Sequence, residues 1–517
     1  MEVASGESGG LVAVTSLAIL LVTLIALYLV LERKKFPPGP IAWPVVGSFP
    51  AISGALPHRA LRNLAEKYGG LMFLRLGSVP TIVVSTAAVA EELFQKHDGN
   101  FLDRARPMAF DVVTEQGKNV VMANGPYWRQ LRKICISELF TVKRQASYQK
   151  IRADEIQNRV KEIVVNSKEG KPINIKDWLQ RVTANNMTCM TTNRRFFGEN
   201  ENKKDIEDFE LMIRGIFDLL GAFIISDYVP YLRFVTKLQG WEKKCESLRA
   251  LYAGVIERAF EIEKHRQRAK DRVDDENFVP DFVDVLLQTP LKNGEMLPDQ
   301  NINLVMGDML SGGTETIATA VEWGFAELML RPELIERLQS ELDTVVGTGR
   351  LVQESDIPNL PFLQAVVKET FRLHPPLTVN IPREATQAFE FRGYKLPKQT
   401  RLILNFHAIH RDPKVYEDPD DFKPDRFVER PEVNHLSGFD SYELTPFSVG
   451  RRMCPAYNLG NMMVTLLLAH LMHAFDWSMP EGKGRESLDM TEQFGLTTGM
   501  KSPLRLVATP RTPATLY

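Results

Sequence analysis

One cysteine in an arginine-rich stretch constrains this chain more than any other feature. Residues 446–456 read Pro-Phe-Ser-Val-Gly-Arg-Arg-Met-Cys-Pro-Ala and precede an apolar run that predicts a helix. Gly450 permits a tight backbone approach. Arg451 and Arg452 favour an anionic sulfur on Cys454, and the start of the following helix lowers a thiol pKa further. The stretch indicates a metal-bound thiolate, and a lone thiolate suits an axial iron ligand better than a zinc site. The simpler interpretation is an ordinary half-buried cysteine.

The composition excludes several classes of protein. The 517 residues are 44% hydrophobic and 25% charged, which is typical of a globular chain. The net charge of −2 shows no basic bias, so we expect small molecules and proteins as partners and no nucleic acid. Four cysteines lie far apart, without CxxC spacing or the density of a disulfide scaffold. The bulk of the protein is therefore expected in the reducing cytosol.

The N-terminus predicts a membrane anchor. Residues 11–31 are apolar or small and uncharged, and at ~1.5 Å per residue such a helix is long enough to cross a bilayer. A cleaved signal peptide is the alternative, but the run is too long for one and no small-residue cleavage site follows it. Basic residues 33–35 follow the run, which favours a cytosolic body. The next segment, Pro-Pro-Gly-Pro at residues 37–40, cannot continue a helix.

These features divide the chain into three expected parts. They are a membrane anchor over residues 1–35, a proline-rich hinge over 36–45 and a catalytic domain over 46–517. Within the domain, residues 71–76 and 81–84 predict two strands joined by a short turn, and 394–404 predict strands of a second small sheet. Residues 87–345 show mostly helical periodicity. The expected fold is mainly α with small β-sheets, preceded by one transmembrane helix.

Two further motifs carry chemistry. Trp128 and Arg132 lie four residues apart on one helical face, where an indole N–H and a guanidinium make a donor pair for a carboxylate. The simpler alternative is a solvated basic face. Residues 303–330 predict a long helix, in which Gly312 and Gly313 each cost about 1 kcal/mol relative to alanine. Such a weak point needs a reason, and close packing of a neighbouring helix would be one.

A predicted helix over residues 360–374 carries Glu369 and Arg372 on one face, where they can form an ion pair. Most such pairs are surface salt bridges of little energetic value. The segment Pro-Asp-Arg-Phe at 424–427 adds Arg426 some fifty residues later.

Taken in order, these motifs resemble those of the cytochrome P450 family over the whole chain, and of its plant microsomal members in particular. The resemblance implies the cytochrome P450 fold and haem b, with Cys454 as the axial ligand of the iron. It also implies cofactor contacts from Trp128, Arg132, Arg383, Phe447 and Arg452. Glu369, Arg372 and Arg426 would form a buried structural triad.

On the other side of the haem, the resemblance implies a distal helix that bulges to leave room for oxygen. Glu315 and Thr316 would deliver protons to bound dioxygen as the catalytic pair. The aromatic region 206–234, with Phe217 and Phe223, would line the substrate path.

The implied activity is monooxygenation in plant specialised metabolism, with electrons from NADPH through NADPH-cytochrome P450 reductase. No GxGxxG fingerprint for a nicotinamide or flavin is present, which agrees with an external electron source. The implied location is the endoplasmic reticulum membrane, as a single-pass protein with a cytosolic catalytic domain. Two alternatives stay open. One is an amino-acid N-hydroxylase that forms an aldoxime. An alanine at the position of Ala456 is typical of those enzymes, whereas a threonine at the position of Thr316 is not. The other alternative is a non-catalytic haem-binding sensor.

Overall fold

The computed structural model describes residues 16, 20, 35–54, 56–198, 202–271 and 280–516. Apart from Ser16, Leu20 and Lys35, the predicted membrane anchor at 1–35 lies outside these ranges. Within them, no helix has both the length and the apolar character that a bilayer-spanning segment requires.

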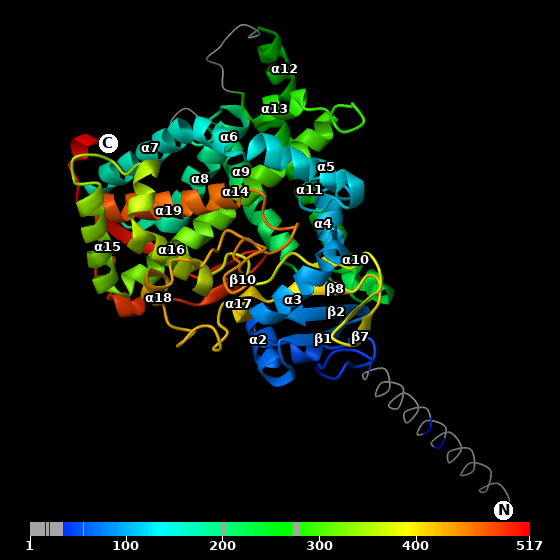
Figure 1. Cartoon of the computed structure of the whole chain (residues 1–517). Helices are drawn as coiled ribbons and strands as arrows, with labels where there is room; N and C mark the ends of the chain where they lie inside the picture. Colours follow the sequence, from blue (N-terminus) through cyan, green and yellow to red (C-terminus); the bar gives the residue numbers. More distant parts are fainter. Residues whose placement is uncertain are drawn as a thin grey trace, which may run out of the picture.

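Helices form most of the body (Figure 1). The α-helices are α2 (Pro57–Tyr68), α3 (Ala87–His97), α4 (Met108–Val113), α5 (Gly125–Ile134), α6 (Val142–Ser147), α7 (Gln149–Ser167), α8 (Ile175–Thr192), α9 (Lys203–Leu220), α10 (Arg233–Leu238), α11 (Trp241–Phe260), α12 (Ile262–Asp271), α13 (Phe282–Gln288), α14 (Asp299–Met329), α15 (Pro332–Val345), α16 (Pro361–Leu373), α17 (Phe406–Ile409), α18 (Asp425–Glu429) and α19 (Tyr457–Ala474). Short 3-10 turns connect several of them, and a π-helical turn, η3 (Cys135–Leu139), continues α5.

The strands are short. They are β1 (Leu71–Leu76), β2 (Val79–Val84), β3 (Asp103–Arg104), β4 (Ile173–Asn174), β5 (Arg383–Glu384), β6 (Phe389–Phe391), β7 (Tyr394–Leu396), β8 (Arg401–Leu404), β9 (Phe475–Ser478), β10 (Glu492–Phe494), β11 (Thr498–Met500) and β12 (Arg505–Pro510). Five of them form one sheet in the order β1-β2-β8-β5-β3, with β2 and β8 parallel and the other neighbours antiparallel. A two-residue turn joins β1 to β2 because Gly77 adopts a φ of +60°, as such hairpin turns require.

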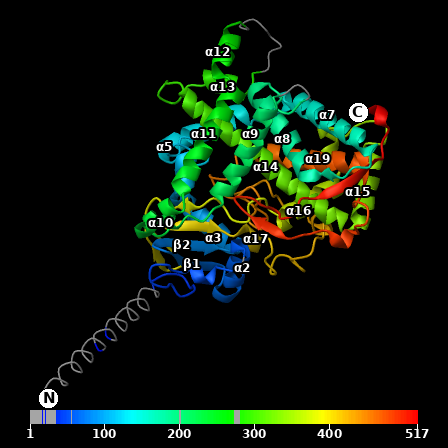
Figure 2. The same cartoon turned by 180° about the vertical axis from the view of Figure 1, so that it is seen from behind.

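The predicted fold, mainly α with small sheets, is confirmed. In the described part of 87–345 the strands are β3 and β4, of two residues each. The five-stranded sheet occupies one end of the molecule, and the helices form the larger lobe in both views (Figures 1 and 2). Helix α14 runs through this lobe and packs against α8, α11, α16 and α19. Its neighbours bury it, so that all residues from Ile317 to Met329 are buried.

The two glycines of α14 have different neighbours. A Cβ on Gly313 would lie 2.5 Å from the sulfur of Met187 on α8, so this glycine permits the close contact of the two helices. A Cβ on Gly312 would meet nothing within 4 Å. The helix is regularly α-helical through both residues and shows no bulge. Helix packing therefore explains Gly313, whereas Gly312 leaves open space.

The predicted triad is confirmed as a buried ionic cluster. Arg372 donates from Nε and Nη2 to the two carboxylate oxygens of Glu369 at 2.7 and 2.8 Å, and both side chains are fully buried. Arg426 donates to the same carboxylate at 3.1 Å. Arg372 also donates to backbone carbonyls of residues 410, 419 and 421. The cluster thus ties α16 to the long connection that leads to the cysteine loop.

Candidate functional site

One cavity contains the predicted cysteine. It has a volume of about 280 Å³ and is lined by α5, α14, the segment 376–381 and the cysteine loop. Cys454 lines it from the loop, and Gly312 and Thr316 line it from α14. The open space beside Gly312 is part of this cavity. The fold therefore places the thiol and the double-glycine helix around one chamber.

A strained loop presents the thiol. Ser448 and Gly450 both adopt positive φ angles, of +70° and +68°. A Cβ on Gly450 would collide with the carboxylate of Asp98, which accepts the backbone N–H of Arg451. The backbone N–H of Cys454 donates to the carbonyl of Phe447 at 2.9 Å, which closes the loop. Gly450 is therefore required by both its conformation and its surroundings.

The predicted electrostatics of Cys454 need correction. Burial raises the pKa of the Cys454 thiol, while a hydrogen bond from the backbone of Ala456 and the charge of Arg132 lower it. Arg451 instead pairs with Asp98 at 3.0 Å, and Arg452 donates to backbone carbonyls such as that of Leu102. The sequence suggested the two adjacent arginines as partners of the sulfur, but the fold turns both away and brings Arg132 from α5.

Three guanidinium groups line the cavity, from Arg104, Arg132 and Arg452. The indole of Trp128 stacks on Arg452 with 3.9 Å between the guanidinium carbon and the ring centre. Burial and the nearby charge of Arg383 lower the pKa of Arg452 to about 9. Trp128 and Arg132 thus both line the cavity, and the guanidinium of Arg452 lies over the indole ring.

Arg383 lies just behind this group and does not line the cavity. Its Nη2 donates to Ser448 Oγ at 2.9 Å and to the Val449 carbonyl at 2.6 Å, so it braces the cysteine loop. Its Nε and Nη1 are buried without a partner. Burial and the charge of Arg104 lower the pKa of Arg383 to about 9.

The arginines lack counter-ions. Among the described residues, no carboxylate forms an ion pair with Arg104, Arg132, Arg383 or Arg452, and Nε of Arg104 is also buried without a partner. Buried guanidinium groups are unfavourable unless an anion compensates them. A ligand with anionic groups, held beside a thiolate, therefore fits these residues.

Sequence reasoning missed Arg104. Strand β3 brings it to the cavity. In the antiparallel pairing of β3 with β5, the backbone of Arg104 lies opposite that of Arg383, some 280 residues away in the chain. Its guanidinium donates to the carbonyl of Ile381. No local signal marks Arg104, because its position follows from the pairing of two two-residue strands.

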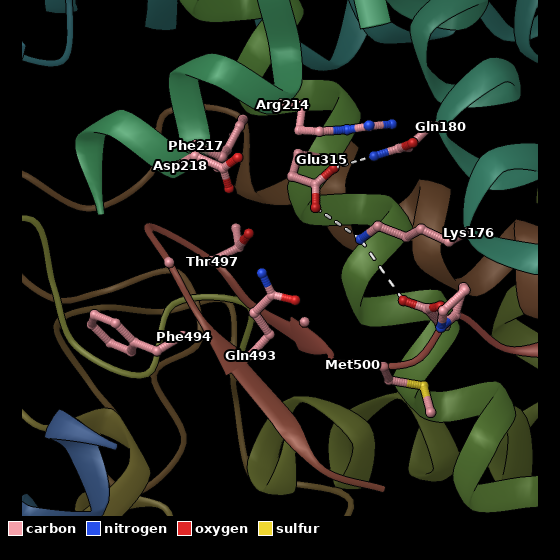
Figure 3. Close-up of a pocket in the computed structure, with 14 residues that line it drawn as sticks. Lys176, Gln180, Arg214, Phe217, Asp218, Glu315, Gln493, Phe494, Thr497 and Met500 are labelled. Carbon is pink, nitrogen blue, oxygen red and sulfur yellow. Dashed lines mark hydrogen bonds and ion pairs between the residues drawn. The ribbon is translucent and has the colours of Figure 1, made fainter. Parts of the chain in front are cut away.

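The predicted catalytic pair is divided between two pockets. Thr316 lines the main cavity, and its hydroxyl donates to the carbonyl of Gly312 at 2.6 Å. Glu315 lines a second pocket of about 190 Å³ and does not line the main cavity. There its carboxylate forms an ion pair with Lys176 at 2.8 Å and accepts a hydrogen bond from Gln180 Nε2 at 2.6 Å (Figure 3). The acid and the hydroxyl are adjacent in sequence but point into different spaces.

Phe217 and Phe223 also lie apart. Phe217 is buried and lines the second pocket (Figure 3). Phe223 is 53% exposed, and its ring lies against Tyr228 and Phe49 with centroids at 5.3 and 4.8 Å. Neither of them lines the main cavity.

An α-helical body with a cysteine and arginines that have no carboxylate partner around one cavity suits a protein that binds an anionic cofactor. The sequence model of the cytochrome P450 family matches residues 37–503, and the chain belongs to this family. It is 37% identical over 495 residues to cytochrome P450 703A2 of Arabidopsis thaliana, which covers 94% of each chain. It is 36% identical to a flavonoid 3′-monooxygenase of Crocosmia x crocosmiiflora, over 95% of this chain and 97% of that protein.

Two further similarities agree with membership of the cytochrome P450 family. Premnaspirodiene oxygenase of Hyoscyamus muticus is 35% identical over 93% of this chain and 94% of its own length. A solved zebra fish cytochrome P450, in a structure with progesterone, has a TM-score of 0.74 at 24% identity and covers 89% of this chain and all of its own, which shows the shared fold. The chain is thus a plant-type cytochrome P450 monooxygenase with haem b as cofactor. This replaces the alternative of a non-catalytic haem sensor.

Proposed function

We propose that this enzyme inserts one oxygen atom from O₂ into a small organic substrate of plant specialised metabolism. Its electrons would come from NADPH through NADPH-cytochrome P450 reductase. The observation that carries the proposal is the position of Cys454 and Thr316 on different walls of one cavity. A thiol that can ligate iron and a hydroxyl that can hold a proton thereby face the same space.

Cys454 would ligate the haem iron as thiolate. Trp128, Arg132, Arg383, Phe447 and Arg452 would hold the cofactor, and Arg104 joins them. The uncompensated guanidinium groups match the two propionates of haem in charge. Phe447 packs on Phe371 with ring centroids at 5.3 Å and borders the thiol. When bound, haem would supply reductive activation of O₂, with one oxygen atom entering the substrate and the other leaving as water.

The chain's own share would include proton delivery. Thr316 Oγ1 holds its proton toward the Gly312 carbonyl, and it borders the cavity where it can release that proton. Glu315 would collect protons from the second pocket, where Lys176 and Gln180 hold its carboxylate. Rotation of the Glu315 side chain about its own χ bonds would carry the proton toward the main cavity. Substitution of Thr316 by valine should then raise peroxide release per NADPH consumed.

Exposed apolar side chains support membrane association. Ile41, Trp43 and Val45 are 64, 59 and 64% exposed, and Tyr231 and Leu238 are 85 and 82% exposed. The segments that carry them meet, because Phe49 contacts both Phe223 and Tyr228. Helix α10 lies next to β2 and β8 in both views (Figures 1 and 2). Such a patch suits an interface with lipid.

This patch supports the expected arrangement in the endoplasmic reticulum membrane, with an anchor at 1–35, a hinge at 36–45 and a cytosolic catalytic domain at 46–517. The hinge is held against the sheet. Phe36 stacks on Phe73 at 4.2 Å, and the N–H of Phe73 donates to the carbonyl of Pro38 at 2.9 Å. Removal of residues 1–35 should weaken but not abolish binding to lipid vesicles, if the exposed patch contributes.

The alternative of an amino-acid N-hydroxylase that forms an aldoxime rests on Ala456. This residue is the N-cap of α19 and lines the main cavity beside Cys454. The two activities differ in their products, so an assay with reductase and NADPH separates them. Phenolics and terpenoids would give hydroxylated products, whereas amino acids would give oximes.

The haem assignment is tested by the carbon monoxide difference spectrum of the reduced protein. The wild type should show the Soret shift of a thiolate-ligated haem, and Cys454→Ser should lose it. Cys189→Ser, at another half-buried cysteine, is the matched control and should keep the shift. A folded, haem-loaded wild type without this shift would refute ligation by Cys454. Substrates would then be sought by haem spectral shifts across phenolics, terpenoids and amino acids.

A further inference from the structure

Three side chains of the kinds that bind metals meet where α2, α17 and β10 come together, away from the site described above. His58 lies in the first turn of α2, His407 on α17 and Glu492 on β10. One ligand atom of each lies within 4.8 Å of the others. Helices α2 and α17 are neighbours in both views (Figures 1 and 2). The fold thus brings two imidazoles and a carboxylate from three distant parts of the chain to one point.

These three side chains are buried, and their polar atoms are only partly used. His58 and His407 are 0 and 3% exposed, and the side chain of Glu492 is 4% exposed. Nε2 of His58 lies 3.0 Å from Oε2 of Glu492. The two imidazole rings meet edge to face with centroids 4.7 Å apart. Nδ1 of His58 and Nδ1 of His407 are both buried without a hydrogen-bond partner among the described residues. Each imidazole therefore has an unused nitrogen.

A purely structural role would be to tie α2 to β10 through the contact of His58 with Glu492. That role gives His407 no function and leaves Nδ1 of both histidines unpaired. Buried polar atoms without a partner are unfavourable, and an ordered water or an ion accounts for many of them in native proteins. A water molecule would not require this combination of side chains. Two imidazoles and one carboxylate are, however, a ligand set of zinc sites with three protein ligands.

The positive charges nearby determine whether a cation can enter. Arg59 donates from Nε to Oε2 of Glu492 at 2.7 Å, but its side chain is 55% exposed and can turn into solvent. Arg62 donates to both carboxylate oxygens of Asp420 at 2.6 and 2.8 Å. Arg411 donates to the same carboxylate at 3.1 Å. Those two arginines share a counter-ion of their own, so Arg59 is the cation that a metal would replace at Glu492.

We propose that His58, His407 and Glu492 bind one zinc ion. With bonds of about 2.0–2.1 Å, neighbouring ligand atoms of a tetrahedral zinc site lie about 3.4 Å apart, close to the 3.0 Å between His58 Nε2 and Glu492 Oε2. The nitrogen of His407 lies within 4.8 Å and would reach this distance by a side-chain rotation. Imidazole ligands favour zinc over magnesium and calcium, which take oxygen ligands. Water would occupy the fourth position.

Zinc at this point would fasten the hairpin of β10 and β11 to α2 and α17. The hairpin borders both spaces of the enzyme. Gln493 and Phe494 line the second pocket (Figure 3). The backbone N–H of Thr498 donates at 2.8 Å to the carbonyl of Pro376, which lines the main cavity. The ion would therefore have a structural role, and the inference does not depend on the proposed function.

Zinc binding by the haem-loaded, full-length chain tests the site. After treatment with EDTA, the protein is dialysed against solutions of buffered free zinc, and elemental mass spectrometry counts bound zinc separately from haem iron. Wild-type protein should bind one zinc that His407→Phe loses. Since even an outer partner of a metal ligand contributes about 10–100-fold to affinity, the loss of His407 should weaken binding by about 100-fold or more. Phenylalanine keeps an aromatic ring beside His58 and leaves the contact of His58 with Glu492 in place.

Two further variants and one spectrum make the test specific. His265→Phe removes a buried histidine from a separate cluster with Asp281 and Asp284, and it should leave zinc binding unchanged. Arg59→Ala removes the cation that competes for Glu492, and it should tighten zinc binding. X-ray absorption at the zinc edge needs no variant, so it holds if His407→Phe does not fold. It should show two imidazoles and oxygen ligands at about 2.0–2.1 Å.

A wild type that binds no zinc at micromolar free zinc would overturn the proposal, as would unchanged binding in folded His407→Phe. Loss of zinc in His265→Phe, or a zinc spectrum with sulfur ligands or fewer than two imidazoles, would assign the ion to another place. Weaker binding in Arg59→Ala would contradict competition at Glu492 and would likewise overturn the proposal. A missing thiolate-type carbon monoxide spectrum would instead contradict the proposed function, so the two failures are distinguishable.

Discussion

Alanine substitutions at the two adjacent glycines of α14 form a matched pair that tests how the helix is packed. Both changes add one methyl group to the same helix, and each gains about 1 kcal/mol of helix propensity. Their surroundings differ. The new Cβ at position 312 meets nothing within 4 Å, whereas the one at position 313 would lie 2.5 Å from Met187 Sδ and 2.7 Å from its Cγ.

The expected magnitudes follow from these distances. Gly312→Ala should stabilise the fold by about 1 kcal/mol, since propensity acts unopposed. In Gly313→Ala, overpacking against α8 costs about 1–3 kcal/mol, which cancels or exceeds the gain. The flexible methionine can shift, so we expect the lower part of this range. Because propensity is common to both variants, the difference between them isolates the steric term.

Thermal unfolding of the haem-loaded protein measures this difference. Unfolding entropy is about 2 cal/mol/K per residue, so a chain of this size shifts its midpoint by only about 1 °C per kcal/mol. Gly312→Ala should therefore melt roughly 1–3 °C above Gly313→Ala. Met187→Ala in the Gly313→Ala background should recover part of the loss through a favourable coupling. A Gly313→Ala protein as stable as Gly312→Ala would refute the packing explanation.

Three further outcomes are expected. Glu369→Gln leaves the fully buried Arg372 without its carboxylate, which should cost about 3–5 kcal/mol and abolish the yield of haem-loaded protein in an expression assay. Arg104→Ala should speed haem transfer to apomyoglobin several-fold, whereas Arg106→Ala, at a more exposed arginine outside the cavity lining, should not. Burial raises the pKa of Glu322 to about 6, so its stabilising proton is fully held below about pH 4.5 and is lost as pH rises through 6. Glu322→Gln should remove this loss. The thermal midpoint of the variant minus that of the wild type should therefore rise between pH 4.5 and 7.5 by the equivalent of about 2 kcal/mol. A midpoint difference that does not change with pH would contradict the assignment.

Local patterns account for the elements that the sequence predicted well. Helical periodicity and turn residues placed α14 and α16 within a few residues of their bounds, and the β1–β2 hairpin likewise. The ion pair of Glu369 and Arg372 followed from spacing within one helix. Such features depend on neighbours in the chain, which is why one sequence suffices to predict them.

Directions of side chains were harder to foresee. Arg451 stands three residues before Cys454 and yet pairs with Asp98, while Arg132, more than three hundred residues away in the chain, lowers the pKa of the thiol. Arg104 reaches the cavity through the pairing of β3 with β5. These relations depend on strand pairing and helix packing between distant segments, for which no local pattern exists.

The sequence by itself determined the family motifs, the helical class of the fold and the cysteine that faces the cavity. Only the tertiary structure decided what surrounds that cysteine. It separated Glu315 from Thr316, although they are neighbours, because successive residues of a helix point about 100° apart and α14 has a pocket on either side. It also placed Asp308 on the cavity lining without an ion-pair partner among the described residues, with hydrogen bonds from Asn119 and the backbone of Val121.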